Sequence, residues 1–285
     1  MILQTFLFHT LFINKEELSL GLVDPQQGVT TQQFRLFVEY YLKKRYVFST
    51  PGRLLAREIG KLVWLTFDDG YYTNHRVLPL LKEYKIPATF YISSNNIRDG
   101  KAFWWDVIYR KRRRVDNELL DSLKKLKAEQ IEAKLLRLYG SKSLRPVSDL
   151  DRPFRPSELK LLAREKFVEL GNHTADHAIL TNYSVSEMAS QIKACQDYLV
   201  LLTGRLPVSI SYPNGNYNQQ VISTTKACGL EVGITVDEGK NLTGMDKFRI
   251  KRFILWGKRD LLTQFRFFEN DAYRFLYNLR RRIKI

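Results

Sequence analysis

Two pairs of residues are the first candidates for chemistry in this chain. His173 and His177 are four residues apart, a spacing that places both imidazoles on one side of a single helical turn. Asp68 and Asp69 are adjacent and directly follow the apolar run 62–67. A histidine pair at this spacing also occurs by chance on protein surfaces, so its interpretation depends on the two aspartates.

The adjacent carboxylates have a structural and a functional interpretation. Two carboxylates at the mouth of an apolar strand are costly unless they are paired or bind a metal. Either one could instead cap the following helix, with Gly70 relieving a tight turn. Capping accounts for one aspartate and leaves the other unexplained, so we favour the functional interpretation.

Two histidines and one carboxylate form a metal-binding face with open positions. Zinc held by three protein ligands lowers the pKa of a bound water to ~7, and such a water can attack a carbonyl carbon. Adjacent residues in a turn point in different directions, so one aspartate can bind the metal while the other takes a proton from the water. We expect one divalent metal, zinc by preference, with Co²⁺, Ni²⁺ and Fe²⁺ left open by this ligand set.

The elements that must position these side chains alternate between strand and helix. The histidines follow the predicted strand 167–170, and barrel enzymes place their sites at the carboxyl ends of strands. The alternation predicts an α/β fold, with an irregular or incomplete barrel favoured over an open sheet. Further strands are expected up to about residue 9 and at 47–48, 62–67, 88–92, 208–212, 231–235 and 250–255, and helices at 31–42, 73–84, 158–165, 185–203 and 219–228.

Residues 99–156 differ in character from the rest and are predicted to form an inserted helical region. The segment 117–138 is charged with regularly spaced leucines and reads as one helix, and 144–156 is rich in proline and aspartate and reads as a loop. Ser157 is expected to cap the helix that follows. The segment begins with Trp104, Trp105 and Asp106, which could line a sugar-binding cleft or pack the insertion.

The chain carries a large positive charge, +16 from 46 Lys+Arg against 30 Asp+Glu. Basic residues cluster at 110–114 and at 280–284, the second in a basic, aromatic helix that begins at Asp260. These clusters are either solvated helix faces or contacts with an anionic partner. Nothing in the chain resembles a nucleic-acid-binding motif, so nucleic acid is not the expected partner.

Compartment is inferred from the first residues and the cysteines. Residues 1–8 lack a basic segment and a small-residue cleavage site, so they read as a buried strand rather than a signal peptide. Two cysteines imply no disulfide framework, and no apolar run approaches the ~20 residues of a spanning helix. A cytoplasmic protein is expected, peripheral to the inner face of a membrane if the basic C-terminal helix binds anionic lipid.

Three motifs resemble those of the polysaccharide deacetylase family, which includes chitooligosaccharide and peptidoglycan deacetylases. The segment Thr66–Gly70 is similar to the first motif, and His173-Thr174-x-x-His177 to the second. Ser211-Tyr212-Pro213-Asn214-Gly215 resembles a variant of the third. The resemblance extends from about residue 5 to residue 255.

The resemblance implies a deformed (β/α) barrel, with residues 1–258 as the catalytic domain and 259–285 as the basic C-terminal helix. It also implies the metal ligands Asp69, His173 and His177. Asp68 would be the general base, and the backbone N–H of Tyr212 would stabilise the oxyanion.

The sequence departs from the family pattern in two places. Ser211 and Tyr212 stand where many members carry an arginine that orients the base, and Arg252 is the candidate replacement. Members often use a late histidine as general acid, but no histidine follows His177, so the acid is left unassigned between protonated Asp68 and a bound water. His9 is interpreted as a packed core histidine in preference to one at the barrel mouth.

The expected function is metal-dependent hydrolysis of an acetyl group, N-linked by preference, from a sugar of a polysaccharide, oligosaccharide or lipid-linked glycan precursor. The partners would be an acetylated carbohydrate and, through the C-terminal helix, an anionic membrane surface or lipid-linked glycan. The alternative is a carbohydrate-binding or regulatory member of the fold without turnover, suggested by the missing acid.

Overall fold

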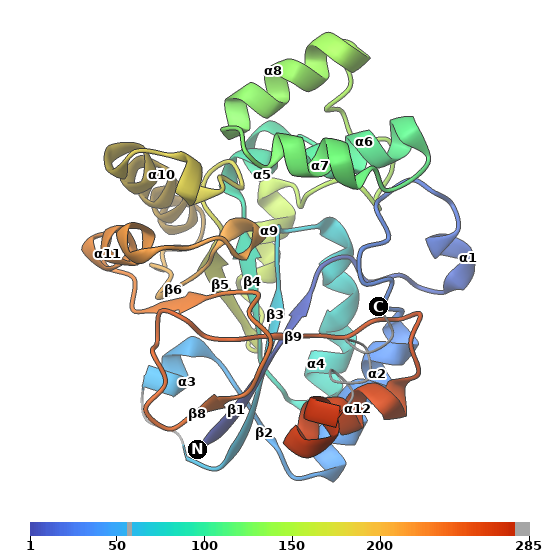
Figure 1. Cartoon of the computed structure of the whole chain (residues 1–285), viewed down its shortest axis with the longest axis vertical. Coiled ribbons are helices and arrows are strands. Elements are labelled where there is room, and N and C mark those ends of the chain that lie inside the picture. The colour runs from blue at the N-terminus through green and yellow to red at the C-terminus, as the bar shows by residue number, and fades with distance from the viewer. Residues whose placement is uncertain (56–58, 277–285) are drawn as a thin grey trace.

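A curled sheet of nine strands forms the centre of the molecule, whose computed structural model describes residues 1–55 and 59–276. The strand order is β7-β6-β5-β4-β3-β1-β8, with β2 beside β3 and β9 beside β1 (Figure 1). Every pairing is parallel except that of β8 with β1. The strands are β1 Ile2–Phe8, β2 Val47–Ser49, β3 Lys61–Phe67, β4 Ala88–Ile92, β5 Val168–Asn172, β6 Ser209–Ser211, β7 Val232–Ile234, β8 Asn241–Leu242 and β9 Phe253–Ile254.

The sheet curls but closes only in part. β2 pairs with the first half of β3, and β4 pairs with its second half. In the same way, β8 pairs with the first half of β1 and β9 with its second half. A single parallel bridge joins Ile234 of β7 to Ile250, so the segment from Ile250 to β9 crosses from one edge strand towards β1. The prediction of a deformed or incomplete (β/α) barrel is confirmed. The short strand β8 was missed, because two residues carry no period that sequence can reveal.

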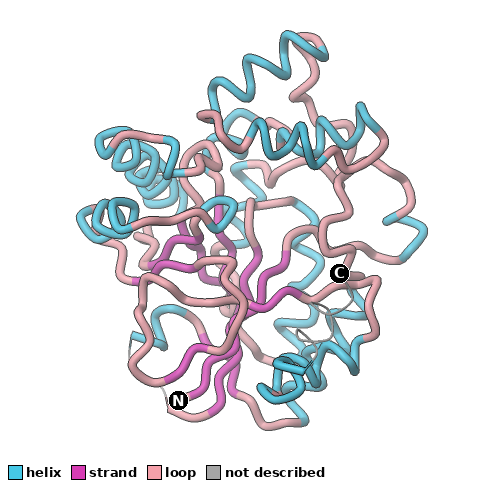
Figure 2. The backbone as a smooth tube through the Cα atoms, in the orientation of Figure 1, coloured by secondary structure: helices cyan, strands magenta, loops and turns pink. Residues whose placement is uncertain are grey.

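Helices surround the strands, as the colouring of Figure 2 shows. α2 begins after Thr30, whose hydroxyl accepts the N–H of Gln33, and α10 ends at Gly204 in the left-handed conformation. The elements outside the insertion are α1 Lys15–Leu18, α2 Thr31–Lys43, α3 Pro51–Leu55, η1 Tyr72–Val77, α4 Leu78–Tyr84, α5 Ser94–Asp99, α9 Pro156–Leu162, η2 Leu180–Asn182, α10 Val185–Thr203, η3 Pro213–Gly215, α11 Gln219–Ala227 and α12 Leu261–Glu269.

Two predicted helices differ in detail. The helix expected from residue 73 to 84 is a 3₁₀ helix, η1, followed by α4. α9 begins at Pro156, one residue before the predicted cap at Ser157, and its cap is Arg155, whose backbone N–H donates to the side chain of Glu158.

The inserted region is helical as predicted, but 117–138 is not one helix. It contains α6 Trp104–Arg112, α7 Asn117–Leu123 and α8 Ala128–Tyr139, stacked at the end of the molecule opposite the N-terminus (Figure 1). The turn between α7 and α8 is held from outside the insertion, where the side-chain amide of Asn182 donates to the carbonyls of Lys124 and Leu126. This long-range contact has no local sequence signal, so the periodic pattern suggested a single helix.

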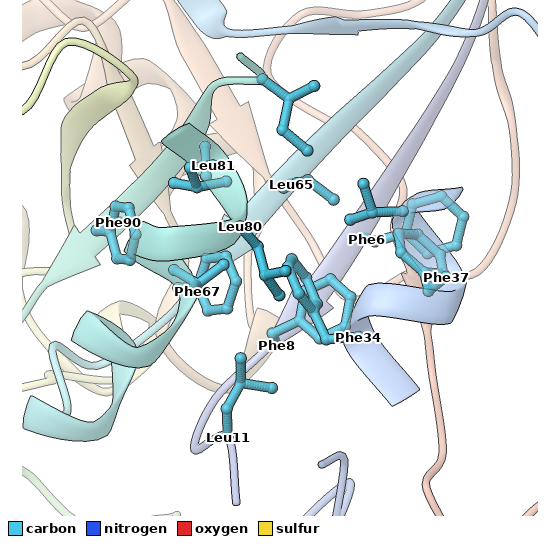
Figure 3. Packing of buried hydrophobic residues seen from close by; sticks show 14 of the residues in the cluster. Phe6, Phe8, Leu11, Phe34, Phe37, Leu65, Phe67, Leu80, Leu81 and Phe90 are labelled. Carbon is cyan, nitrogen blue, oxygen red and sulfur yellow. The ribbon is translucent and has the colours of Figure 1, made fainter. Parts of the chain in front are cut away.

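The main core lies between the sheet and the helices α2, α4 and α12. Phe8, Phe67 and Phe90 occupy facing positions on β1, β3 and β4, with ring centroids 5.3 and 5.0 Å apart (Figure 3). Phe34 and Phe37 of α2 pack onto the same ladder. Each buried ring contributes roughly 1.5–3 kcal/mol through removal from water, so this ladder holds the strands that carry the site in place.

The C-terminal region is part of this core up to residue 269. Phe265, Phe267 and Phe268 of α12 are buried, and the ring of Phe268 lies 5.2 Å from that of Phe6. The helix ends at Glu269, and residues 271–276 are helical again. The expected helix does begin after Asp260, whose side chain caps α12, but it is interrupted at Asn270, and the cluster 280–284 lies outside the described residues. Among the described residues, no helix is both long and apolar enough to cross a membrane.

Candidate active site

Three side chains from two strand ends meet above the sheet. Asp69 follows β3, and His173 and His177 follow β5, two strands that flank β4. The Nε2 atoms of His173 and His177 lie 3.2 and 3.4 Å from Oδ1 of Asp69. One ligand atom from each side chain can be chosen so that all three lie within 4.8 Å of one another.

The two histidines meet in a loop, and the predicted helical turn is wrong. Thr174 and His177 adopt left-handed φ angles of 63° and 49°, which no α-helix contains. Two side chains fold the loop, because Asn172 accepts the N–H of Thr174 and the hydroxyl of Thr174 accepts the N–H of Ala178. The four-residue spacing therefore predicted correctly that the two histidines lie close together, but the cause is this loop and not a helical turn.

The donor set fits a divalent cation. Both carboxylate oxygens of Asp69 are buried and lack a hydrogen-bond partner among the described residues, an arrangement that is costly for a charge without a counter-ion. The Nδ1 atom of His173 lies 2.7 Å from the carbonyl of Ser211, which directs its Nε2 lone pair towards Asp69. Two imidazole nitrogens and one carboxylate oxygen are a ligand set typical of catalytic zinc and of other transition metals.

The protonation states of His177 and Asp69 also fit a metal site. Burial lowers the pKa of His177 to about 3, so its imidazole is neutral at pH 7. Burial alone would raise the pKa of Asp69, but His9, His173 and His177 outweigh it and lower this pKa to about 2. A neutral imidazole and an ionised carboxylate are the forms that bind metal.

Asp68 has surroundings opposite to those of Asp69. The Nη1 atom of Arg252 donates to both of its oxygens, at 2.9 and 2.8 Å, and the hydroxyl of Ser211 donates to Oδ2 at 2.9 Å. Arg252 is itself buried and anchored through Nε to the carbonyl of Thr235 at 2.7 Å. The structure thus brings the predicted Arg252 against Asp68 across 184 residues of chain.

The structure corrects the expectation for Tyr212. Its backbone N–H donates to the carbonyl of Ile234 at 3.0 Å as part of the β6–β7 pairing, so it is not free to receive an oxyanion. Asn214, two residues later, has a left-handed φ of 57° and lines the active-site cavity. Its N–H has no acceptor among the described residues. Sequence reasoning missed this residue, although Pro213 before it and Gly215 after it marked a turn at a strand end.

His9 was interpreted as a core residue and lies instead in the cavity. Its Nε2 atom is 3.8 Å from Oδ2 of Asp69, and its Nδ1 lies 2.9 Å from the side-chain oxygen of Gln27. The available signal was its position at the end of β1, because β1 neighbours β3 and parallel strands end on one side of a sheet. His75, by contrast, contacts the carbonyl of Tyr72 and stacks on its ring.

The site opens into a cavity of about 530 Å³, within the range of small-molecule sites. Its walls are largely aromatic and apolar. Trp105 packs the insertion and also lines the cavity. It packs with Phe103 in the core of the insertion, and its ring lies 4.6 Å from that of His177. Trp104, Trp105, Ile179, Val236 and Trp256 line the cavity together with Asp68, Asp69, His9, His173, His177, Asn214 and Arg252.

Comparison with known proteins identifies similar sequences and folds. The sequence profile of the polysaccharide deacetylase family matches residues 56–233. A poly-beta-1,6-N-acetyl-D-glucosamine N-deacetylase of Staphylococcus epidermidis is 23% identical over 234 residues, 80% of this chain and 68% of that protein. A peptidoglycan-N-acetylmuramic acid deacetylase of Bacillus subtilis is 32% identical over 185 residues, 64% of this chain and 28% of that protein.

Solved structures share the fold at lower identity. A Streptococcus pyogenes deacetylase in complex with acetate superposes with a TM-score of 0.61 at 17% identity, covering 90% of this chain and 94% of that one. A de-N-acetylase from Aggregatibacter actinomycetemcomitans gives a TM-score of 0.63 at 14% identity, with coverage of 94% and 100%. The match to the family profile, together with the similarity to the two deacetylases, confirms the resemblance drawn from the three motifs.

Proposed function

Because this chain belongs to the polysaccharide deacetylase family of hydrolases, we propose that it uses one divalent metal to remove an acetyl group, N-linked, from a sugar of a polysaccharide, oligosaccharide or lipid-linked glycan precursor. The observation that carries the proposal is the pair Asp68 and Asp69. One carboxylate is held by buried Arg252, and its neighbour is buried without a hydrogen-bond partner beside two histidines. The carboxylate held by Arg252 would be the base, and the carboxylate without a hydrogen-bond partner would be the metal ligand.

Asp69, His173 and His177 would hold the cation, with zinc preferred for this ligand set. A cation there supplies Lewis acidity, which lowers the pKa of water and polarises the acetyl carbonyl. The orientation of His173 by the carbonyl of Ser211 is the contribution of the chain that supports this binding.

Asp68 would act as the general base. Its carboxylate would take a proton from the attacking water as the bond between the water oxygen and the acetyl carbon forms. Arg252 and Ser211 orient this carboxylate, because three charge-assisted or hydroxyl hydrogen bonds fix its two oxygens. Asp68 lines the cavity beside Asp69, where the acetyl group would bind.

Two further groups complete the proposed reaction. The N–H of Asn214 would donate to the oxygen on which negative charge develops, in place of Tyr212. The imidazole of His9 would give a proton to the sugar nitrogen as the C–N bond breaks, leaving acetate and an amine. The inactive alternative rested on the lack of a histidine after residue 177, and His9 in the cavity supports turnover because it is a candidate for the missing acid.

Metal content and acetate release test the proposal together. Purified protein should contain about one divalent metal per chain by mass spectrometry, and His173→Ala should contain almost none. The loaded chain should release acetate from N-acetylglucosamine oligomers, whereas His173→Ala should not. His75→Ala is the matched control, since His75 lies outside the cavity. A chain that binds no metal under any loading condition would overturn the proposal.

The membrane contact stays a prediction, because the cluster 280–284 lies outside the described residues. Replacing Arg280, Arg281 and Arg282 with glutamine should weaken binding to vesicles that contain phosphatidylglycerol. Truncation at residue 260 would be a poor test, since α12 contributes Phe265, Phe267 and Phe268 to the main core. Unchanged vesicle binding in the triple variant would contradict the prediction.

A further inference from the structure

The basic cluster of the inserted region surrounds a hollow that the proposed reaction does not use. A second cavity, of about 510 Å³, is lined by the end of α6 and by the loop that follows α8. Five cationic side chains line it and no carboxylate does: Arg110, Lys111, Arg113, Lys142 and Arg145. We call these five residues and their cavity the basic pocket.

The charges of the basic pocket are largely uncompensated. Arg110 pairs with buried Asp151 and donates to the carbonyls of Ser143 and Arg145, so it stabilises the conformation of the loop that follows α8. Among residues 1–55 and 59–276, the side chain of Arg113 donates only to the carbonyl of Gly21. Lys111, Lys142 and Arg145 are exposed, and their side chains have no anionic partner among the described residues.

Several cations elsewhere on the surface have a carboxylate partner. Arg35 contacts Glu83, Lys82 contacts Glu165 and Lys101 contacts Glu132, each at 2.7–2.8 Å. Like charges that share one hollow repel one another, so an unpaired group of this size is unfavourable unless an anion binds there. A second sign of a binding site is the hydroxyl of Ser143, which lines the pocket and is buried without a hydrogen-bond partner among the described residues.

The basic pocket lies next to the active-site cavity. α6 begins with Trp104 and Trp105, which line the active-site cavity, and reaches the basic pocket at Arg110. Five residues of helix span about 8 Å. The loop before α2 also touches both cavities, through Leu22 in the basic pocket and Asp24 in the other, and Figure 1 shows this loop beside α6.

We propose that the basic pocket binds a phosphate or diphosphate group carried by the acetylated sugar substrate, so that the enzyme acts on a phosphate-linked sugar. Arginine and lysine around a hollow with hydroxyl and backbone donors match the chemistry of phosphate, whose oxygens accept several hydrogen bonds at once. The assignment of the phosphate to the substrate rests on the proposed function, whereas phosphate binding in the pocket does not.

Direct binding separates the two claims. Inorganic pyrophosphate is titrated calorimetrically into the full chain, into the triple variant Lys111→Gln, Lys142→Gln, Arg145→Gln, and into a control with the same charge change, Lys160→Gln, Arg164→Gln, Lys193→Gln. All six residues are exposed, and the control residues lie outside both cavities. All three proteins also carry His173→Ala, so that pyrophosphate cannot bind through a metal. Three lost contacts should weaken binding by about tenfold in the first variant, and the control should stay within about twofold. Equal losses in both variants, or no binding by the parent, would overturn the proposal.

A second titration tests the link to the substrate without turnover. In an Asp68→Asn background, UDP-N-acetylglucosamine should bind at least about tenfold more tightly than N-acetylglucosamine, and the triple variant should abolish that preference. A preference that survives the triple variant would overturn the assignment to the substrate. Binding to phosphatidylglycerol vesicles that depends on the same three residues, without any preference for the nucleotide sugar, would assign the phosphate to a lipid headgroup and overturn it as well. Failure of acetate release alone would affect only the proposed function.

Discussion

The mouth of the barrel and the aromatic core beneath it differ in backbone regularity and in the charge that they bury. At the mouth, Asp69, Thr174, His177 and Asn214 adopt left-handed φ angles, and both oxygens of Asp69 are buried without hydrogen bonds among the described residues. In the core, Phe8, Phe67 and Phe90 stand on regular strands and stack at facing positions. Strain and uncompensated charge gather where chemistry is proposed, and the core supplies the stability that tolerates them.

Removing a metal ligand should affect activity most and stability little. Asp69→Asn eliminates a buried charge and one metal ligand, so acetate release should fall by about 1,000-fold or more. The free energy of unfolding of the metal-free protein should change by no more than about 2 kcal/mol, because the interactions with His9, His173 and His177 that lower the pKa of Asp69 offset the cost of burying its charge. Urea denaturation of the metal-free proteins measures the second effect. A metal-free variant destabilised by several kcal/mol would show that the carboxylate is structural.

Removing a ring from the core should have the converse effect. Phe67→Ala opens a cavity in the ladder and should lower the free energy of unfolding by about 3–5 kcal/mol. Metal bound per folded chain should be unchanged at low temperature. Phe275→Ala, at a side chain that is 68% exposed, is the control and should cost under about 1 kcal/mol. If the metal bound per folded chain fell together with the free energy of unfolding, the mouth and the core would not be independent of each other.

Arg252→Gln should reduce both activity and stability, because Arg252 is buried and binds Asp68 of the active site. It leaves buried Asp68 without its counter-charge, which should lower the free energy of unfolding by about 3 kcal/mol and reduce acetate release. Arg249→Gln is the matched control, since its ion pair with Asp246 is exposed and contributes about 0–1 kcal/mol. Equal effects in the two variants would contradict a special role for Arg252.

The smallest expected effect concerns Asp106, a buried carboxyl on α6 of the insertion. Burial raises its pKa well above the usual value, against the opposing hydrogen bonds from Tyr71 and from the N–H of Asp24. In the pH window above 3.8, the native state therefore holds the proton more strongly than the unfolded state does. The Asp106 contribution is complete below that pH and is lost as pH rises through the raised pKa.

Asp106→Asn should flatten the dependence of unfolding free energy on pH above pH 4 while leaving metal content intact. Chemical denaturation at several pH values measures the slope. Asp121→Asn, at an exposed position, should leave the slope as it is in the parent chain. A slope unchanged in Asp106→Asn would mean that this carboxyl is ionised in the native state.

Prediction from the sequence succeeded where the signal was local. The strands β3 and β4 and the helices expected at 31–42 and 185–203 each depend on neighbouring residues. It failed where distant contacts decide. The turn between α7 and α8 needs Asn182, and the pairing that occupies the N–H of Tyr212 needs Ile234.

The sequence by itself determined the family, the alternating α/β plan and the candidate ligands Asp69, His173 and His177, because these depend on residue type, order and spacing. Only the tertiary structure decided which groups meet. It brought His9 to within 3.8 Å of Asp69 across 60 residues of chain, and it set Arg252 against Asp68. Parallel strands deliver their carboxyl ends to one side of a sheet, so proximity there depends on strand order, which is a property of the whole fold.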